Sequence, residues 1–201
     1  MVIAIAVISL LGVLVCASCL VYLHIAPTGL NPVRDPVSQY GITDYFTFYR
    51  AAALSLGVAS LTLAVALLEA LTEANAAGIV FLVILGFARL TIGWVPMDAP
   101  GAPRTSTGLR HNLLATAFFA SATVAAFLFT GTFAGDPALS GIASASGVLA
   151  WAMAVFSALI LLTSLVGPLK KYFGLAERLL YVAVLAWVAT VAIALIASVA
   201  S

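Results

Sequence analysis

Long apolar segments alternate with short polar ones along the chain, and this alternation is the main structural signal of the sequence. Segments of this kind reach the length of about 20 residues that an α-helix needs to cross a bilayer. They are long Ala-, Leu- and Val-rich runs, which excludes the short alternating strands of a membrane β-barrel. We therefore predict an all-α, polytopic integral membrane protein, a six-transmembrane-helix bundle in one domain over residues 1–201. The predicted spans are 2–23, 51–71, 76–95, 112–133, 141–166 and 175–200.

The composition agrees with a lipid environment. Hydrophobic residues make up 64% of the chain, charged residues only 7%, and the mean hydropathy is +1.22, whereas soluble domains carry about a quarter charged residues. A net charge of +1 excludes the basic surface of a nucleic-acid-binding protein. Cys16 and Cys19 both lie in the first span without further cysteines, so we interpret them as small apolar residues.

The basic residues predict the orientation. The first, third and fifth loops contain seven Lys and Arg residues, and the other loops and both termini contain none. By the positive-inside rule, loops 1, 3 and 5 face the cytoplasm and both termini lie outside. The first span has no Lys or Arg before it and exceeds the length of a signal-peptide core, so we expect it to remain as a span in the plasma membrane.

The connecting loops differ greatly in length. The second and fourth are tight turns, whereas the first (24–50) and third (96–111) are long and polar. Long ordered loops in compact proteins tend to carry function. In the first loop, Asp35 and Pro36 form a typical helix start and Gly41 a typical stop, which predicts one short helical turn with Asp35 as its cap.

Arg89 is the most informative residue inside a predicted span, because an ionised side chain at membrane depth costs a few kcal/mol unless it is paired or reaches the interface. Gly86 and Gly93 share its helical face, so a neighbouring segment can approach closely there. We expect Arg89 to face protein and to pair with Asp98 or Asp35. The alternative is a side chain that extends to the interface.

Arg110 and His111 precede the fourth span, where the helix dipole disfavours positive charge. We expect an anion to compensate for them. The candidates are Asp98, Asp35 and the phosphate of a bound lipid or other ligand.

The polar loops carry motifs that resemble the domain of unknown function 998 family, which comprises bacterial six-helix integral membrane proteins. The resemblance covers nearly the whole chain and implies a six-helix bundle, but no activity is established for that family. It directs attention to Arg34, Asp35, Ser38, Asp98 and His111. The motifs are Pro27-Thr28-Gly29-x-Asn31-Pro32-x-Arg34-Asp35-Pro36-Val37-Ser38-x-Tyr40-Gly41, Pro96-Met97-Asp98, Gly108-x-x-His111 and Gly174-Leu175-Ala176-Glu177-Arg178.

The first functional hypothesis is the binding of an anionic lipid headgroup or a similar ligand at one membrane face. Membrane lipids are then the expected partners. The candidate ligand-binding residues come from the first and third loops and the third span, and chain order brings them to the same face. They are Arg34, Asp35, Ser38, Arg89, Asp98, Arg110 and His111.

The second hypothesis is a membrane hydrolase or transferase. Asp98 and His111 would act as an acid–base pair with Ser38 as nucleophile. In a metal-dependent version, His24, His111, Asp35 and Asp98 would be the ligands. The chain has no closely spaced His-Glu-x-x-His motif, so the sequence predicts no metal and no cofactor.

The third hypothesis is a structural or accessory subunit whose polar loops only hold helices together. The expected ion pairs are then Arg89 with Asp98 and Asp35 with Arg110. Small residues at four-residue spacing in the second and fifth spans permit close helix contacts, and hence a homo-oligomer or another membrane protein as partner.

Overall fold

The computed structural model describes residues 1–200 as six α-helices joined by turns and short 3-10 helices, labelled η. The domain predicted over 1–201 includes residue 201, which lies outside the described residues. In chain order the elements are α1 (Val2–Ile25), η1 (Val37–Ile42), α2 (Phe46–Ala70), α3 (Ala76–Ile92), α4 (Ser106–Gly135), η2 (Ser140–Ile142), α5 (Ala143–Leu165), η3 (Gly167–Tyr172) and α6 (Phe173–Ala200).

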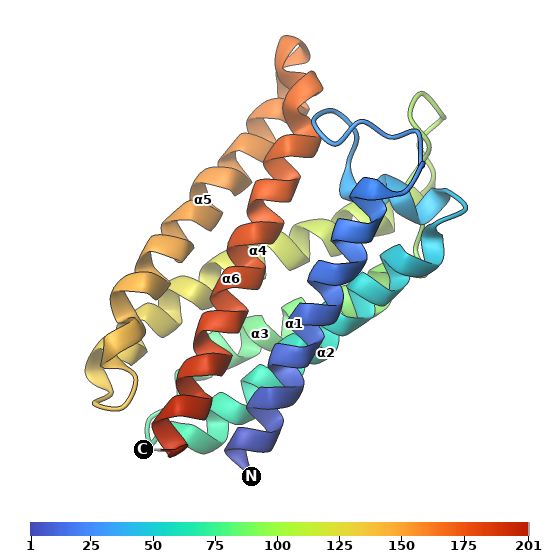
Figure 1. The fold of residues 1–201 in the computed structure, drawn as a ribbon. Coiled ribbons are helices and arrows are strands. Elements are labelled where there is room, and N and C mark those ends of the chain that lie inside the picture. Colours follow the sequence, from blue (N-terminus) through green and yellow to red (C-terminus); the bar gives the residue numbers. More distant parts are fainter. Residues whose placement is uncertain (201) are drawn as a thin grey trace.

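The α-helices form a ring in chain order. Each packs against its neighbours in the sequence, and α6 returns to contact α1 (Figure 1). Loop 1 (26–45), loop 3 (93–105) and the η3 connection lie together at one end of the bundle, which we call the loop end. The start of α1, the end of α6 and the two other connections lie at the opposite end (Figure 1). The prediction of an all-α, polytopic helical protein is confirmed.

Five helices are long and apolar enough to cross a membrane, and α3, with 17 residues, lies at the short limit of that length. Three predicted boundaries differ from the structure by three residues or more. α2 begins at residue 46 instead of 51, α3 ends at 92 instead of 95, and α4 begins at 106 instead of 112. The hydropathy pattern marks the part of a helix that lies in lipid, whereas α2 and α4 continue into polar residues at the loop end.

Small residues allow α1, α2 and α3 to approach one another. A Cβ on Gly12 of α1 would lie 2.9 Å from the Cβ of Ala59, and the Ser9 hydroxyl donates a hydrogen bond of 2.8 Å to the Ala59 carbonyl. A Cβ on Gly57 of α2 would lie 3.0 Å from the carbonyl oxygen of Gly86 on α3. Because lipid offers no hydrophobic driving force, such close backbone packing is what associates helices in a membrane.

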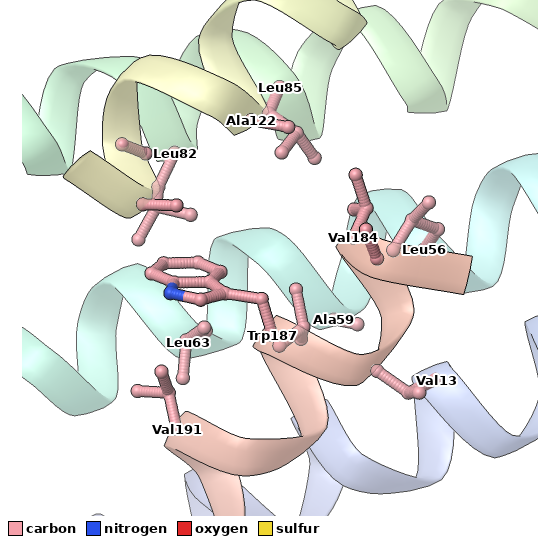
Figure 2. Close-up of a cluster of buried hydrophobic side chains, with 14 of the residues drawn as sticks. Val13, Leu56, Ala59, Leu63, Leu82, Leu85, Ala122, Val184, Trp187 and Val191 are labelled. Atoms are coloured by element: carbon pink, nitrogen blue, oxygen red, sulfur yellow. The ribbon is translucent and has the colours of Figure 1, made fainter. Parts of the chain in front are cut away.

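Trp187 of α6 fills the centre of the ring and is 1% exposed. Its indole Nε1–H donates a hydrogen bond of 2.9 Å to the Ser146 hydroxyl of α5, which is also bonded to Thr130 of α4 at 2.8 Å. The indole therefore connects three helices through one polar group and packs against apolar residues of the others. Figure 2 labels Val13, Leu56, Ala59, Leu63, Leu82 and Leu85 from α1, α2 and α3, together with Ala122 of α4 and Val184 and Val191 of α6 itself.

We expect Trp187→Phe to lower the free energy of unfolding in detergent by about 1–3 kcal/mol, because it leaves a cavity and removes the bond to Ser146. Trp151→Phe is the matched control, since Trp151 is 66% exposed on the outer surface, and we expect a change within about 0.5 kcal/mol. Denaturant unfolding followed by circular dichroism measures both. Equal losses for the two variants would contradict the central role of Trp187.

Candidate functional site

Loop 1 and the start of α6 supply each other's missing hydrogen-bond partners. The Leu175 N–H, in the first turn of α6, donates to the Val33 carbonyl at 2.9 Å. In return, Glu177 of α6 accepts a bond of 2.7 Å from the Val37 N–H, the first of η1. Helix starts leave such N–H groups without a partner inside the helix. The short helix predicted in loop 1 exists, but Glu177 caps it and Asp35 does not.

Gly174 permits this contact. A Cβ at this position would overlap the carbonyl oxygen of Asp35 and lie 2.8 Å from that of Pro32. The backbone of loop 1 therefore rests directly on the backbone of α6, and a larger residue would separate the two.

Arg178 extends the same contact with its whole guanidinium group. Nη1–H donates to the Asp35 carbonyl at 2.8 Å, Nη2–H to the Tyr40 hydroxyl at 3.2 Å, and Nε–H to Nε2 of His24 at 2.6 Å. The other ring nitrogen of His24, Nδ1, lies 2.5 Å from the Leu20 carbonyl. We assign the proton to Nδ1, since both neighbours then have a matching partner. Arg178 thus joins α1, loop 1 and α6.

Asp35 pairs with its neighbour Arg34. The Arg34 Nε lies 2.8 Å from Asp35 Oδ1, and Nη2 lies 3.2 Å from Oδ2. Hydrogen bonds from the Arg34 guanidinium hold the pKa of the Asp35 carboxyl below its usual range, with a further contribution from the Asn31 N–H. The predicted pairs of Asp35 with Arg110 and with Arg89 are therefore wrong. A partner one residue away is cheaper in chain entropy than one on another helix.

Asp98 organises the start of α4. Its carboxylate accepts hydrogen bonds from the Thr105 N–H at 3.0 Å and the Thr105 hydroxyl at 2.6 Å, and these bonds lower the pKa of the Asp98 carboxyl. The Thr105 hydroxyl oxygen accepts in turn from the Gly108 N–H at 3.0 Å and caps the helix. A Cβ on Gly108 would overlap the Asp98 carboxylate. The candidates for an anion at this helix start were Asp98, Asp35 and a ligand phosphate. The structure places Asp98 at the start of α4.

The remaining loop residues of the predicted site are spread over separate contacts. His111 is 2% exposed, and its Nδ1 lies 2.6 Å from the Val95 carbonyl. The Ser38 hydroxyl donates to the Met97 sulfur at 3.2 Å and so links loops 1 and 3. Arg110 lies exposed on α4. Within residues 1–200, no hydrogen bond joins Ser38, His111 or Asp98 to one another.

The four candidate metal ligands are also kept apart. His24 contacts Arg178, Asp35 contacts Arg34, and Asp98 contacts Thr105. Among the described residues, no group of three or more His, Cys, Asp or Glu side chains could hold a metal ion.

Arg89 faces protein and is 1% exposed. Its Nη1–H donates a bond of 2.7 Å to the Tyr181 hydroxyl of α6, and its guanidinium carbon lies 4.7 Å from the ring centre of Phe118 and 5.3 Å from that of Tyr181. The prediction that Arg89 pairs with Asp98 or Asp35 is wrong. Asp98 is bonded to Thr105, and Asp35 is bonded to Arg34. Neutral aromatic groups of α4 and α6 surround the cation instead.

Sequence reasoning missed the polar face of α6. Glu177 and Tyr181 lie four residues apart and hence on one side of the helix, and Arg178 lies beside them. The available signal was an acidic residue and a basic residue close to the start of an otherwise apolar span. The sequence indicated Arg178 as evidence for orientation and as part of a family motif but gave it no place in the site, whereas it holds loop 1 in place.

A pocket of about 390 Å³ opens at the loop end between loop 1, loop 3 and the end of α5. Two basic side chains and the Gln39 amide lie among its walls, which are otherwise formed by Pro, Phe, Ser, Thr and Asp side chains. The lining residues are Arg34, Asp35, Pro36, Gln39, Pro100, Thr163, Ser164, Lys170 and Phe173. Lys170 was not among the predicted site residues.

We expect Gly174→Ala to displace loop 1 and lower the free energy of unfolding by about 1–3 kcal/mol, since its methyl group would overlap the Asp35 carbonyl. Amide hydrogen exchange should accelerate over residues 33–42. Gly131→Ala in α4 is the control, because nothing lies within 4 Å of a Cβ there. Unchanged exchange in the Gly174 variant would refute the close contact between loop 1 and α6.

The comparisons with known proteins agree with the loop motifs. No curated protein and no solved structure matches the chain. A protein family described as "Protein of unknown function (DUF998)" matches residues 10–194, which is nearly the whole chain. The chain is therefore a member of the DUF998 family.

Proposed function

We propose that this protein binds an anionic lipid headgroup in the pocket at its loop end. The observation that carries the proposal is the joint presence of Arg34 and Lys170 in one pocket. The two residues come from loop 1 and η3, so only the folded chain brings them together. Two cations beside a pocket at the end of a transmembrane bundle match the phosphate of a lipid at the membrane surface.

Both cations have capacity for a ligand. Arg34 uses Nε and Nη2 for Asp35, which leaves Nη1, and its side chain is 64% exposed. Within residues 1–200, Lys170 makes no ion pair. A phosphate group contacting both would replace water around two exposed charges and would bury little protein charge. The cost of binding is therefore low.

The walls of the pocket suit the rest of a lipid. Pro36, Pro100 and Phe173 form apolar surface beside the two cations. An apolar groove of about 320 Å³ runs along α5 and α6 and shares Thr163 with the pocket. A lipid with its phosphate on Lys170 would have a path for one acyl chain along this groove.

The distribution of charge over the molecule favours an anion at the same end. Apart from Arg89, all the basic residues lie at the loop end, where seven basic side chains stand against four acidic ones. The opposite end carries three acidic side chains and no basic ones. The loop end therefore has a positive potential that attracts anionic lipids.

We expect Lys170→Gln to weaken the binding of phosphatidylglycerol about fivefold, which corresponds to about 1 kcal/mol for one lysine near the surface. Native mass spectrometry of the purified chain in a neutral detergent measures the retained lipid. Lys171→Gln is the control, because Lys171 lies outside the pocket lining, with its ammonium group 5.1 Å from the ring centre of Tyr172. Equal retention of phosphatidylglycerol and phosphatidylcholine by the wild type would refute the proposal.

The same charge distribution supports an orientation in the plasma membrane with loops 1, 3 and 5 in the cytoplasm and both termini outside. A chain with Cys16 and Cys19 replaced by Ala would carry one new cysteine, Glu73→Cys or Arg104→Cys. On intact cells, an impermeant maleimide should label Glu73→Cys at once and Arg104→Cys only after permeabilisation. The reverse pattern would contradict this orientation and would show that the charges at the loop end do not follow the positive-inside rule.

A further inference from the structure

Arg89 lies at the centre of buried polar atoms that the described protein leaves without partners. Two of its guanidinium nitrogens, Nε and Nη2, make no hydrogen bond, and neither does the hydroxyl of Tyr49 or the Nε2 of His111. All three residues are at most 2% exposed. Buried polar groups are hydrogen-bonded in the great majority of cases, so each such atom requires an explanation.

The three side chains belong to one centre. Tyr49 and His111 both interact electrostatically with the Arg89 guanidinium, and Tyr181 is bonded to it at 2.7 Å. They reach it from α2, α4 and α6, while Arg89 itself comes from α3. Four helices of the ring thus direct polar groups to the same buried place.

The charge of this centre is not balanced by a carboxylate. Residues 1–200 provide no ion pair to Arg89. Glu177 is the buried carboxylate within electrostatic range, and it is bonded to the Val37 N–H. The faces of Phe118 and Tyr181 offset part of the positive charge. Nε and Nη2 of the guanidinium nevertheless remain without a hydrogen-bond partner among the described residues.

We propose that Arg89 and Tyr49 form a buried site for an oxyanion of the phosphate class. The Nε–H and Nη2–H groups lie on one edge of the planar guanidinium and can donate in parallel to two oxygens of one phosphate. The Tyr49 hydroxyl donates to the same anion. The bound charge then compensates the buried cation, which is the condition under which buried charges are found in membrane proteins.

The site lies near the loop end and not at the bilayer centre. Arg89 is in the last turn of α3, and Tyr49 is in the first turn of α2. A phosphate can therefore come from the cytoplasmic or external solution as the free ion, or from the headgroup of a lipid. The centre shares no residue with the lining of the pocket that contains Lys170, so it does not rest on the proposed function.

Thermal unfolding of the delipidated full chain in dodecyl maltoside tests the site with two probes. The first is inorganic phosphate, compared with chloride at equal ionic strength, and the second is phosphatidic acid, compared with phosphatidylcholine. A probe at about ten times its Kd should raise the Tm by about 3–6 °C. A rise with inorganic phosphate identifies the free ion as ligand, and a rise with phosphatidic acid alone identifies the lipid headgroup.

The variants separate this site from other effects of charge. All the chains compared carry Lys170→Gln, so that the headgroup pocket does not contribute: in this background Arg89→Gln should abolish the rise in Tm, whereas Arg110→Gln, at an exposed position on α4, should retain it. Tyr49→Phe keeps the ring and removes a hydroxyl whose polar neighbour is Arg89 itself, so it should fold and lose most of the rise. The proposal fails if neither probe raises the Tm, or if Tyr49→Phe or Arg89→Gln responds as the Lys170→Gln chain alone does. Since every chain in this comparison carries Lys170→Gln, the presence or failure of the headgroup pocket does not affect the test.

Discussion

The reciprocal hydrogen bonding between loop 1 and α6 is the interaction on which the loop end depends. Helix starts expose N–H groups that cannot remain unpaired next to lipid. Carbonyl oxygens of loop 1 accept from the first turn of α6, and the Glu177 carboxylate of α6 accepts from the first N–H of η1. Arg34, Asp35 and Gln39, which line the pocket, are all placed by this one contact. The site is thus a consequence of helix capping.

Positive charge without a carboxylate partner recurs at this end of the molecule. The Arg178 guanidinium donates to a carbonyl, a hydroxyl and an imidazole, all neutral acceptors. Arg89 contacts neutral aromatic residues. Among residues 1–200, the basic side chain that forms an ion pair with a carboxylate is Arg34, and its partner is Asp35. Neutral acceptors position a cation but leave its charge free to act on other molecules. An anion at the surface pocket and an anion at buried Arg89 would therefore both be attracted by positive charge that no carboxylate compensates.

The sequence allowed some features of the site to be predicted and concealed others. Arg89 was expected to face protein because an unpaired guanidinium in lipid is costly, and this holds. Its partner was expected to be an aspartate, yet Asp98 bonds Thr105 and Asp35 bonds Arg34, both close in the chain. Local partners took the carboxylates that long-range reasoning had assigned to Arg89. Arg110, expected beside the site, lies on an exposed face of α4.

The sequence by itself determined the class of fold, the places of the spans and the unequal loops, because the length of an apolar run is matched to the thickness of a bilayer. It also determined the excess of positive charge in the loops that share one end. Only the tertiary structure decided that Glu177 caps η1, that Tyr181 receives the bond from Arg89, and that Lys170 joins Arg34 in one pocket. These contacts join residues far apart in the chain, and hydropathy records the preference of each residue for lipid or water but not which polar group will satisfy another.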